Sequence, residues 1–65
     1  MEYTNSQIRE LIAEYIHSEV DRRILYLRLV DGLTFEAIGF EVKLDTKTVR
    51  TRVHKLENVL YRHLP

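Results

Sequence analysis

The sequence predicts a small all-α domain of four helices, the last two forming a tight pair at the C-terminal end. Three observations indicate this fold: apolar residues recur at intervals of three and four, a capping residue precedes each such stretch, and helix breakers are scarce. Among 65 residues there are two Gly, and the single Pro comes last. Without cysteine, no disulfide or thiolate metal site supplements the core. We therefore expect one domain, residues 1–65, of marginal stability.

The first two predicted helices, residues 5–16 and 19–31, form the support of the domain. Thr4 and Gln7 match a capping box ahead of the first helix, which has a single apolar stripe: Ile8, Leu11, Ile12, Tyr15 and Ile16. Ser18 caps the second helix, and Gly32 ends it in a left-handed conformation. The second helix is apolar on two sides, with Val20, Ile24 and Leu27 on one and Leu25 and Leu29 on the other. It should therefore be the central helix.

Residues 34–63 are predicted to hold two helices joined by a tight turn. Thr34 caps the first, residues 35–42, whose inward positions are Phe35, Ile38 and Val42, while Phe40 lies off this stripe and is either exposed or covers a neighbouring helix. Asp45 caps the second, residues 46–63, whose inner face is Val49, Val53, Leu56 and Leu60. A helix, a short turn and a longer helix make a helix-turn-helix unit.

Such a unit needs particular residues at particular places. These are a small residue at a close helix crossing, an apolar residue in the turn, a cap and an apolar anchor, here Gly39, Leu44, Asp45 and Val49. The second helix must also present donor-rich side chains outward, and it has Lys47, Arg50, Thr51 and His54. The sequence meets all of these requirements.

The charges are divided unevenly along the chain. Residues 1–42 carry four Arg and eight acidic residues, whereas residues 43–65 carry six basic and two acidic residues. The net charges of the two parts, −4 and +4, cancel in the formal total of 0. This asymmetry is typical of a nucleic-acid surface, and the alternative is a bipolar domain whose charges only interact with water.

A family resemblance covers about residues 20–64. The pieces that carry it are RRILYLRLVDGLTFEAIG and TKTVRTRVHKLENVL, in that order. They resemble region 4 of bacterial sigma factors of the sigma-70 class, most closely the extracytoplasmic-function and phage-encoded sigma-like proteins. Two features depart from the family: Lys43 stands where the turn usually has Gly, which costs roughly 1 kcal/mol if the residue is left-handed, and Phe40-Glu41 reverses the usual polar-then-apolar order. The part of a sigma factor that melts the promoter −10 element is missing, so we expect a stand-alone region-4-like regulator from a phage or mobile element.

The resemblance implies sequence-specific binding of double-stranded DNA as a transcription regulator, with helix 46–63 in the major groove. The residues expected to contact the groove are Lys47, Arg50, Thr51 and His54. Those expected to contact phosphates are Lys43, Thr46, Arg52 and Lys55, although Arg52 could instead pair with acids of the first two helices. The N-terminus of helix 35–42, at Thr34 or Phe35, could also face a phosphate. The alternative is a protein-interaction module that binds RNA polymerase or a sigma partner without contacting DNA.

Other classes of function find little support in the sequence. The three His residues, His17, His54 and His63, are scattered and lack ligand spacing, so no metal site and no cofactor is expected. Glu10 and Glu14 lie one turn apart but on an exposed helix, and no catalytic constellation is present, so no enzyme is expected. No apolar run is long enough to span a membrane and no signal peptide is recognisable, which predicts a soluble cytoplasmic protein.

A homodimer is a further hypothesis. Val59, Tyr61 and Leu64 should lie beyond the reach of a small three-helix core, and with Tyr3 and the first helix they could form a dimer face. A dimer would hold two recognition helices about 34 Å apart, one turn of DNA.

Overall fold

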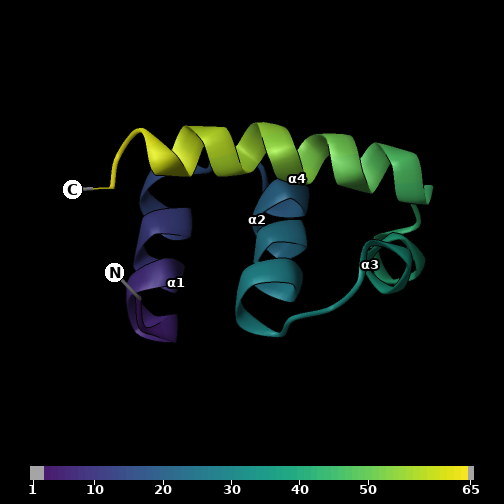
Figure 1. Ribbon diagram of the computed structural model, residues 1–65, viewed down its shortest axis with the longest axis horizontal. Helices are drawn as coiled ribbons and strands as arrows, with labels where there is room; N and C mark the ends of the chain where they lie inside the picture. Colours follow the sequence, from purple (N-terminus) through teal and green to yellow (C-terminus); the bar gives the residue numbers. More distant parts are fainter. Residues whose placement is uncertain (1–2, 65) are drawn as a thin grey trace.

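The computed structural model describes residues 3–64 and confirms a small, compact all-helical domain. Its elements are α1 (Asn5–Tyr15), α2 (Glu19–Leu25), the π-helical segment η1 (Tyr26–Val30), α3 (Phe35–Val42) and α4 (Thr46–Tyr61). No strand occurs in this range. Helices α1 and α2 stand side by side, α4 runs across them, and α3 lies under the N-terminal end of α4 (Figure 1). No helix of the described residues is both long and apolar enough to cross a membrane.

The predicted caps are present at all four helix starts. Thr4 Oγ1 accepts from the Gln7 amide at 3.2 Å and the Gln7 side chain accepts from the Thr4 amide at 2.8 Å, which completes the capping box of α1. At α2, Ser18 Oγ accepts from the Asp21 amide at 3.4 Å. These bonds satisfy amides that have no partner within the helix.

The second predicted helix, residues 19–31, is not one regular α-helix. Its second half is the π-helical segment η1, in which the Asp31 amide donates to the Tyr26 carbonyl at 3.1 Å, five residues back. The helix region ends before Gly32, which has the predicted left-handed conformation with φ 71°. The prediction therefore placed the segment correctly but missed its change of helix type.

Two apolar clusters lie on different sides of α2. One buries Ile12, Ile16, Leu25, Leu56 and Leu60. The other buries Ile24, Ile38, Val49 and Val53. The neighbours Ile24 and Leu25 thus belong to different clusters, which confirms that this helix is central. The prediction that Val20 belongs to the buried stripe was wrong. Val20 is 47% exposed, although it lies one turn before the buried Ile24.

The C-terminal half of α4 is part of the core, which corrects the expectation of a three-helix core. Val59 packs against the cluster shared with α1. The rings of Tyr15 and His63 stack with centroids 3.7 Å apart, so α1 extends its packing beyond the end of α4. The helix itself ends at Tyr61 rather than at residue 63. Tyr61 remains 56% exposed, as a dimer face would require.

Candidate nucleic-acid interface

The turn between α3 and α4 is built around a left-handed Lys43 and the missing side chain of Gly39. Lys43 has φ 61° and ψ 45°, the strained conformation expected of a residue at a glycine position. The Leu44 amide donates to the Gly39 carbonyl at 2.9 Å. A Cβ on Gly39 would lie 2.5 Å from the Leu44 carbonyl oxygen and 3.6 Å from Val49 Cγ2. The close approach is therefore to the backbone of the turn, and not primarily to the crossing helix that was expected.

Asp45 fixes the start of α4. Its carboxylate accepts from the Thr48 amide at 3.3 Å and from the Thr48 hydroxyl. These two hydrogen bonds, the hydroxyl first, lower the pKa of Asp45 below its ordinary value of 3.8 because they stabilise the charged carboxylate. Thr34 caps α3 in the same way, accepting from the Ala37 amide at 3.1 Å.

The cap of α4 should make stability fall in acid. Because the pKa of Asp45 is lowered in the folded state, its contribution to the free energy of unfolding is present above pH 3.8 and is lost as the pH falls through the folded-state pKa. We expect the urea midpoint to fall less steeply between about pH 5 and about pH 2 in Asp45→Asn than in the wild type, because Asn caps without titrating. Identical slopes for the two proteins would contradict this role of Asp45.

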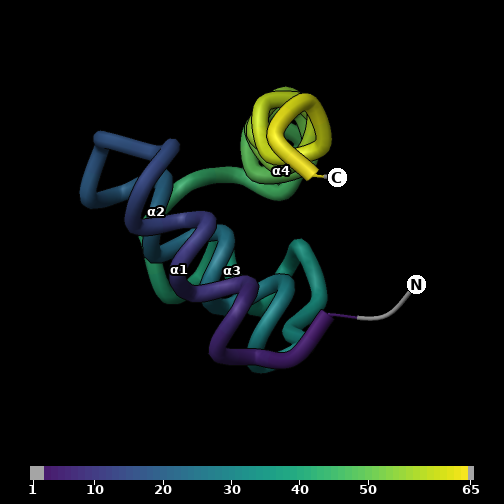
Figure 2. The backbone as a smooth tube through the Cα atoms, turned by 90° about the vertical axis from the view of Figure 1, so that its left-hand side faces the viewer, coloured from purple at the N-terminus to yellow at the C-terminus, as the bar shows by residue number. Residues whose placement is uncertain are grey.

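The residues predicted to contact DNA lie mostly on the uncovered side of α4. The other helices all lie on one side of α4 when it is viewed along its axis (Figure 2). Lys43, Lys47, Arg50, Thr51, Arg52, His54 and Lys55 are exposed, and only Thr46 is half-buried. Four of them line one shallow groove together with Thr48, namely Lys47, Thr51, Arg52 and Lys55. This groove brings together two residues expected at base edges and two expected at phosphates, while Arg50 and His54 lie outside it.

Most of the cations on this surface have no ion-pair partner. Within residues 3–64 the ion pairs are Arg23–Glu41 and Arg52–Asp21, and His54 lies 4.0 Å from Glu57, a pair that is ionic only when the imidazole is protonated. Lys43, Lys47, Arg50 and Lys55 take part in none of them. Their positive charge is therefore not neutralised by the described part of the chain, and an anionic partner would be attracted to it.

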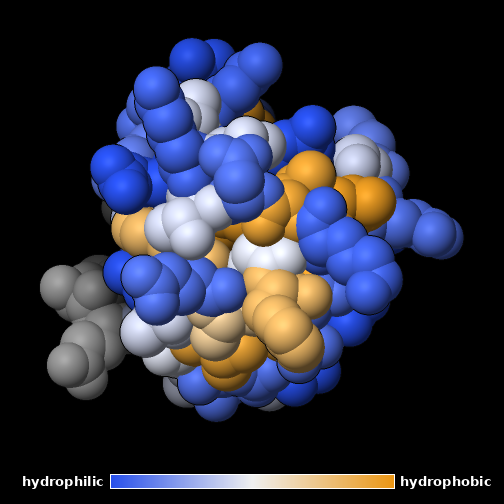
Figure 3. Space-filling view, turned by 90° about the vertical axis from the view of Figure 1, so that its right-hand side faces the viewer, coloured by the Kyte–Doolittle hydropathy of each residue, from blue (hydrophilic) through white to orange (hydrophobic). Residues whose placement is uncertain are grey.

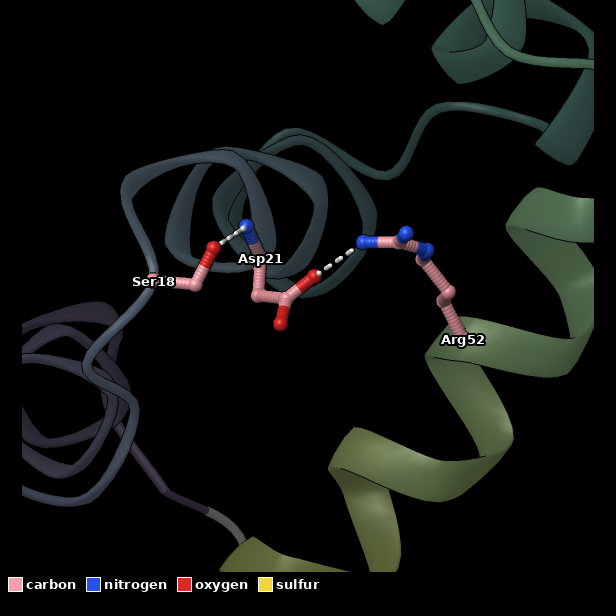
Figure 4. A network of polar contacts seen from close by, with 3 residues as sticks. All are labelled: Ser18, Asp21 and Arg52. Carbon is pink, nitrogen blue, oxygen red and sulfur yellow. Dashed lines mark hydrogen bonds and ion pairs between the residues drawn. The ribbon is translucent and has the colours of Figure 1, made fainter.

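Arg52 is the exception among the Lys and Arg residues of this surface, because it pairs with an acid of α2, the alternative to phosphate contact that the sequence left open. Its guanidinium donates to Asp21 Oδ1 at 3.0 Å, and the Asp21 amide in turn donates to Ser18 Oγ (Figure 4). The contact joins α4 to the first turn of α2. Arg52 can still donate from its other nitrogen atoms, but Asp21 competes with any phosphate for it.

Two of the predicted contact residues are held by contacts that the sequence did not reveal. The Thr51 hydroxyl donates to the Lys47 carbonyl at 3.0 Å. The His54 ring meets the Phe35 ring edge-on, with ring centroids 6.3 Å apart.

Arg28 supports the same ring from η1. Its guanidinium lies 4.3 Å over the Phe35 ring, and it donates to the Leu33 carbonyl at 2.9 Å, so it ties η1 to the loop before α3. Cation–π pairs leave no periodic signal in a sequence, because they depend on how helices cross.

The α3 end of the molecule carries an apolar patch. In the space-filling view of this end, hydrophobic side chains occupy the centre and hydrophilic ones surround them (Figure 3). Phe40 on α3 is 84% exposed, so it does not cover a neighbouring helix. Leu33, Phe35, Val42 and Leu44 are only partly buried against the adjacent cluster.

Neither a search for metal sites nor comparison with known proteins points to a function. No group of three or more potential metal ligands is found in the described part of the chain. Comparison with models of protein families, with curated proteins and with solved structures found no match.

Proposed function

We propose that this protein binds double-stranded DNA sequence-specifically as a transcription regulator, using a helix-turn-helix unit like that of sigma region 4. The observation that carries the proposal is the set of unpaired cations on the uncovered side of α4, beside a turn of helix-turn-helix type. An α-helix fits the major groove, which is about 12 Å wide. The 16 residues of α4 give it ample length to cross the groove.

The exposed residues divide into two roles in this proposal. Lys47, Arg50, Thr51 and His54 face base edges, where an Arg reads guanine through two hydrogen bonds. Lys43, Thr46 and Lys55 contact phosphates, which add affinity but no sequence information directly. Arg52 contacts phosphate only to the extent that Asp21 releases it.

Substitutions of Arg50 and Lys55 test this division, once a preferred site has been selected from a random pool of duplexes. Arg50→Ala should weaken binding to the selected site by about 1–3 kcal/mol and bring it closer to nonspecific binding. Lys55→Ala should weaken binding to all duplexes evenly and reduce the dependence of log affinity on log salt by about one phosphate contact. The measurement is fluorescence anisotropy over a salt series.

Arg9→Ala is the matched control, because Arg9 is an exposed cation on α1 away from the α4 groove. It should leave affinity and salt dependence unchanged. If neither Arg50→Ala nor Lys55→Ala alters binding to any duplex, α4 does not contact DNA and the proposal fails.

A second candidate is a protein-interaction module that binds RNA polymerase or a sigma partner. The observation that favours it is Phe40, 84% exposed in the patch at the α3 end. Exposed apolar patches ringed by polar residues often mark protein interfaces. Under this alternative, Phe40→Ser abolishes capture of polymerase. The affinity of the protein for duplex DNA is then negligible and does not change over the salt series.

A further inference from the structure

An apolar groove lies at the end of the molecule opposite α3, between α1, η1 and the end of α4. Its lining is almost entirely apolar and includes Tyr3, Ile8, Leu11, Leu29, Tyr61 and Leu64. A second shallow depression shares three of these residues, Tyr3, Leu11 and Leu64, and adds Gln7, Glu10 and Glu14. The two form one surface, which we term the α1 groove. It shares no residue with the α4 groove proposed to face DNA.

The α1 groove has an acidic edge, and a basic residue follows its lining residue Tyr61 in the chain. Glu10 and Glu14 are exposed one helical turn apart on α1, and neither takes part in an ion pair within residues 3–64. At the end of α4, Tyr61 is 56% exposed and is followed by the exposed Arg62. One surface therefore offers an apolar depression with an acidic edge, the exposed ring of Tyr61 in its lining, and a cation next to that ring in the chain.

We infer that the α1 groove is covered by a second copy of this chain in a symmetric pairing. Tyr61 of each copy lies on the groove of the other, and Arg62 of each copy pairs with Glu14 of the other. In a two-fold interface every contact is made twice, so a surface that holds both halves of a contact is complementary to itself. The charges of the groove and of the helix end meet this condition.

The size of the chain is compatible with such an interface. A stable interface typically buries about 800 Å² per partner, roughly a sixth of the 4731 Å² accessible surface of this chain. The groove, the outward face of α1 and the end of α4 would all have to take part. A domain of this size gains from the added apolar burial because its own core is small.

The pairing has a consequence for DNA that rests on the proposed function. Arg50 and Tyr61 are eleven positions apart on α4, which at 1.5 Å per residue is about 16.5 Å. Two α4 helices that meet end to end near Tyr61 would separate their Arg50 residues by about 33 Å, close to the 34 Å turn of DNA. The selected DNA site should then be palindromic, with half-sites one turn apart.

Charge reversal tests the pairing, with sedimentation equilibrium as the measurement and circular dichroism as the check of folding. The wild type should pass from monomer to dimer as its concentration rises. Glu14→Arg and Arg62→Glu should each weaken the dimer at least about tenfold, because each sets like charges against each other. An equimolar mixture of the two variants should dimerise as the wild type does, since both ion pairs of the mixed dimer are then complementary. Glu36→Arg, at an exposed acid on α3, is the control and should leave the dimer unchanged.

A wild type that stays monomeric over the whole range overturns the inference, and so does a mixture that associates no better than its components. Failure of the pairing and failure of DNA binding are distinguishable. A monomer that binds a single half-site removes only the pairing, whereas a dimer that binds no duplex removes only the proposed function.

Discussion

Replacing Gly39 with Ala is expected to lower the free energy of unfolding by about 1–3 kcal/mol, which is the usual cost of overpacking. A Cβ at this position would lie 2.5 Å from the carbonyl oxygen of Leu44, and a backbone atom cannot rotate away as a side chain can. Within a helix, Gly→Ala otherwise stabilises by about 1 kcal/mol. The sign of the effect therefore reports whether the turn is held rigidly against α3. Urea unfolding followed by circular dichroism measures it.

Gly32→Ala is the informative comparison for Gly39→Ala. Gly32 is left-handed, but an added Cβ would meet nothing within 4 Å. Its substitution tests backbone strain alone, about 1–2 kcal/mol. If Gly39→Ala proves as stable as the wild type or more so, the turn can move aside and does not fix the position of α4.

Truncating either buried residue at the C-terminal end of α2 is expected to have the largest effect on stability. Ile24 and Leu25 are both 0% exposed, and Ile→Ala or Leu→Ala in a core costs about 2–5 kcal/mol. At about 0.05–0.15 kcal/mol per residue, a 65-residue domain has only about 3–10 kcal/mol in total. Ile24→Ala and Leu25→Ala should therefore each lower Tm by about 8 °C or more.

Val20→Ala is the matched control on the same helix. Val20 is 47% exposed, and its truncation should change the free energy of unfolding by no more than about 0.5 kcal/mol. Thermal denaturation compares the three variants directly. Losses as small for Ile24→Ala or Leu25→Ala as for Val20→Ala would contradict a core on both sides of α2.

The elements that the sequence predicts well are those specified by neighbouring residues. Thr4, Ser18, Thr34 and Asp45 all cap the helices they were assigned to, because a cap needs only its own side chain and an amide two or three residues on. At Lys43 the family resemblance left a different or a strained turn open, and the left-handed φ of 61° shows that the residue takes the conformation usual for Gly. The π-helical segment was not predictable, because the same apolar spacing suits either helix type.

Contacts between distant elements were harder to predict. Asp21 and Arg52 are 31 positions apart, so their ion pair depends on how α2 and α4 cross, and the sequence left the choice open. The position of Val59 was predicted wrongly because α1 was not expected to reach the end of α4. The assignment of eight residues to DNA contact stays a prediction, since exposure and charge describe what a surface can bind and not what it binds.

The π-helical segment also bears on tolerance to changes in chain length. Its hydrogen bond from Asp31 to Tyr26 spans five residues, one more than an α-helical turn requires. Deleting one residue from this segment could be absorbed by converting it to ordinary α-helix. The loop, α3 and α4 would then keep their places relative to α2. The η1 segment, between α2 and α3, therefore contains one residue more than an α-helical path of the same turns would need.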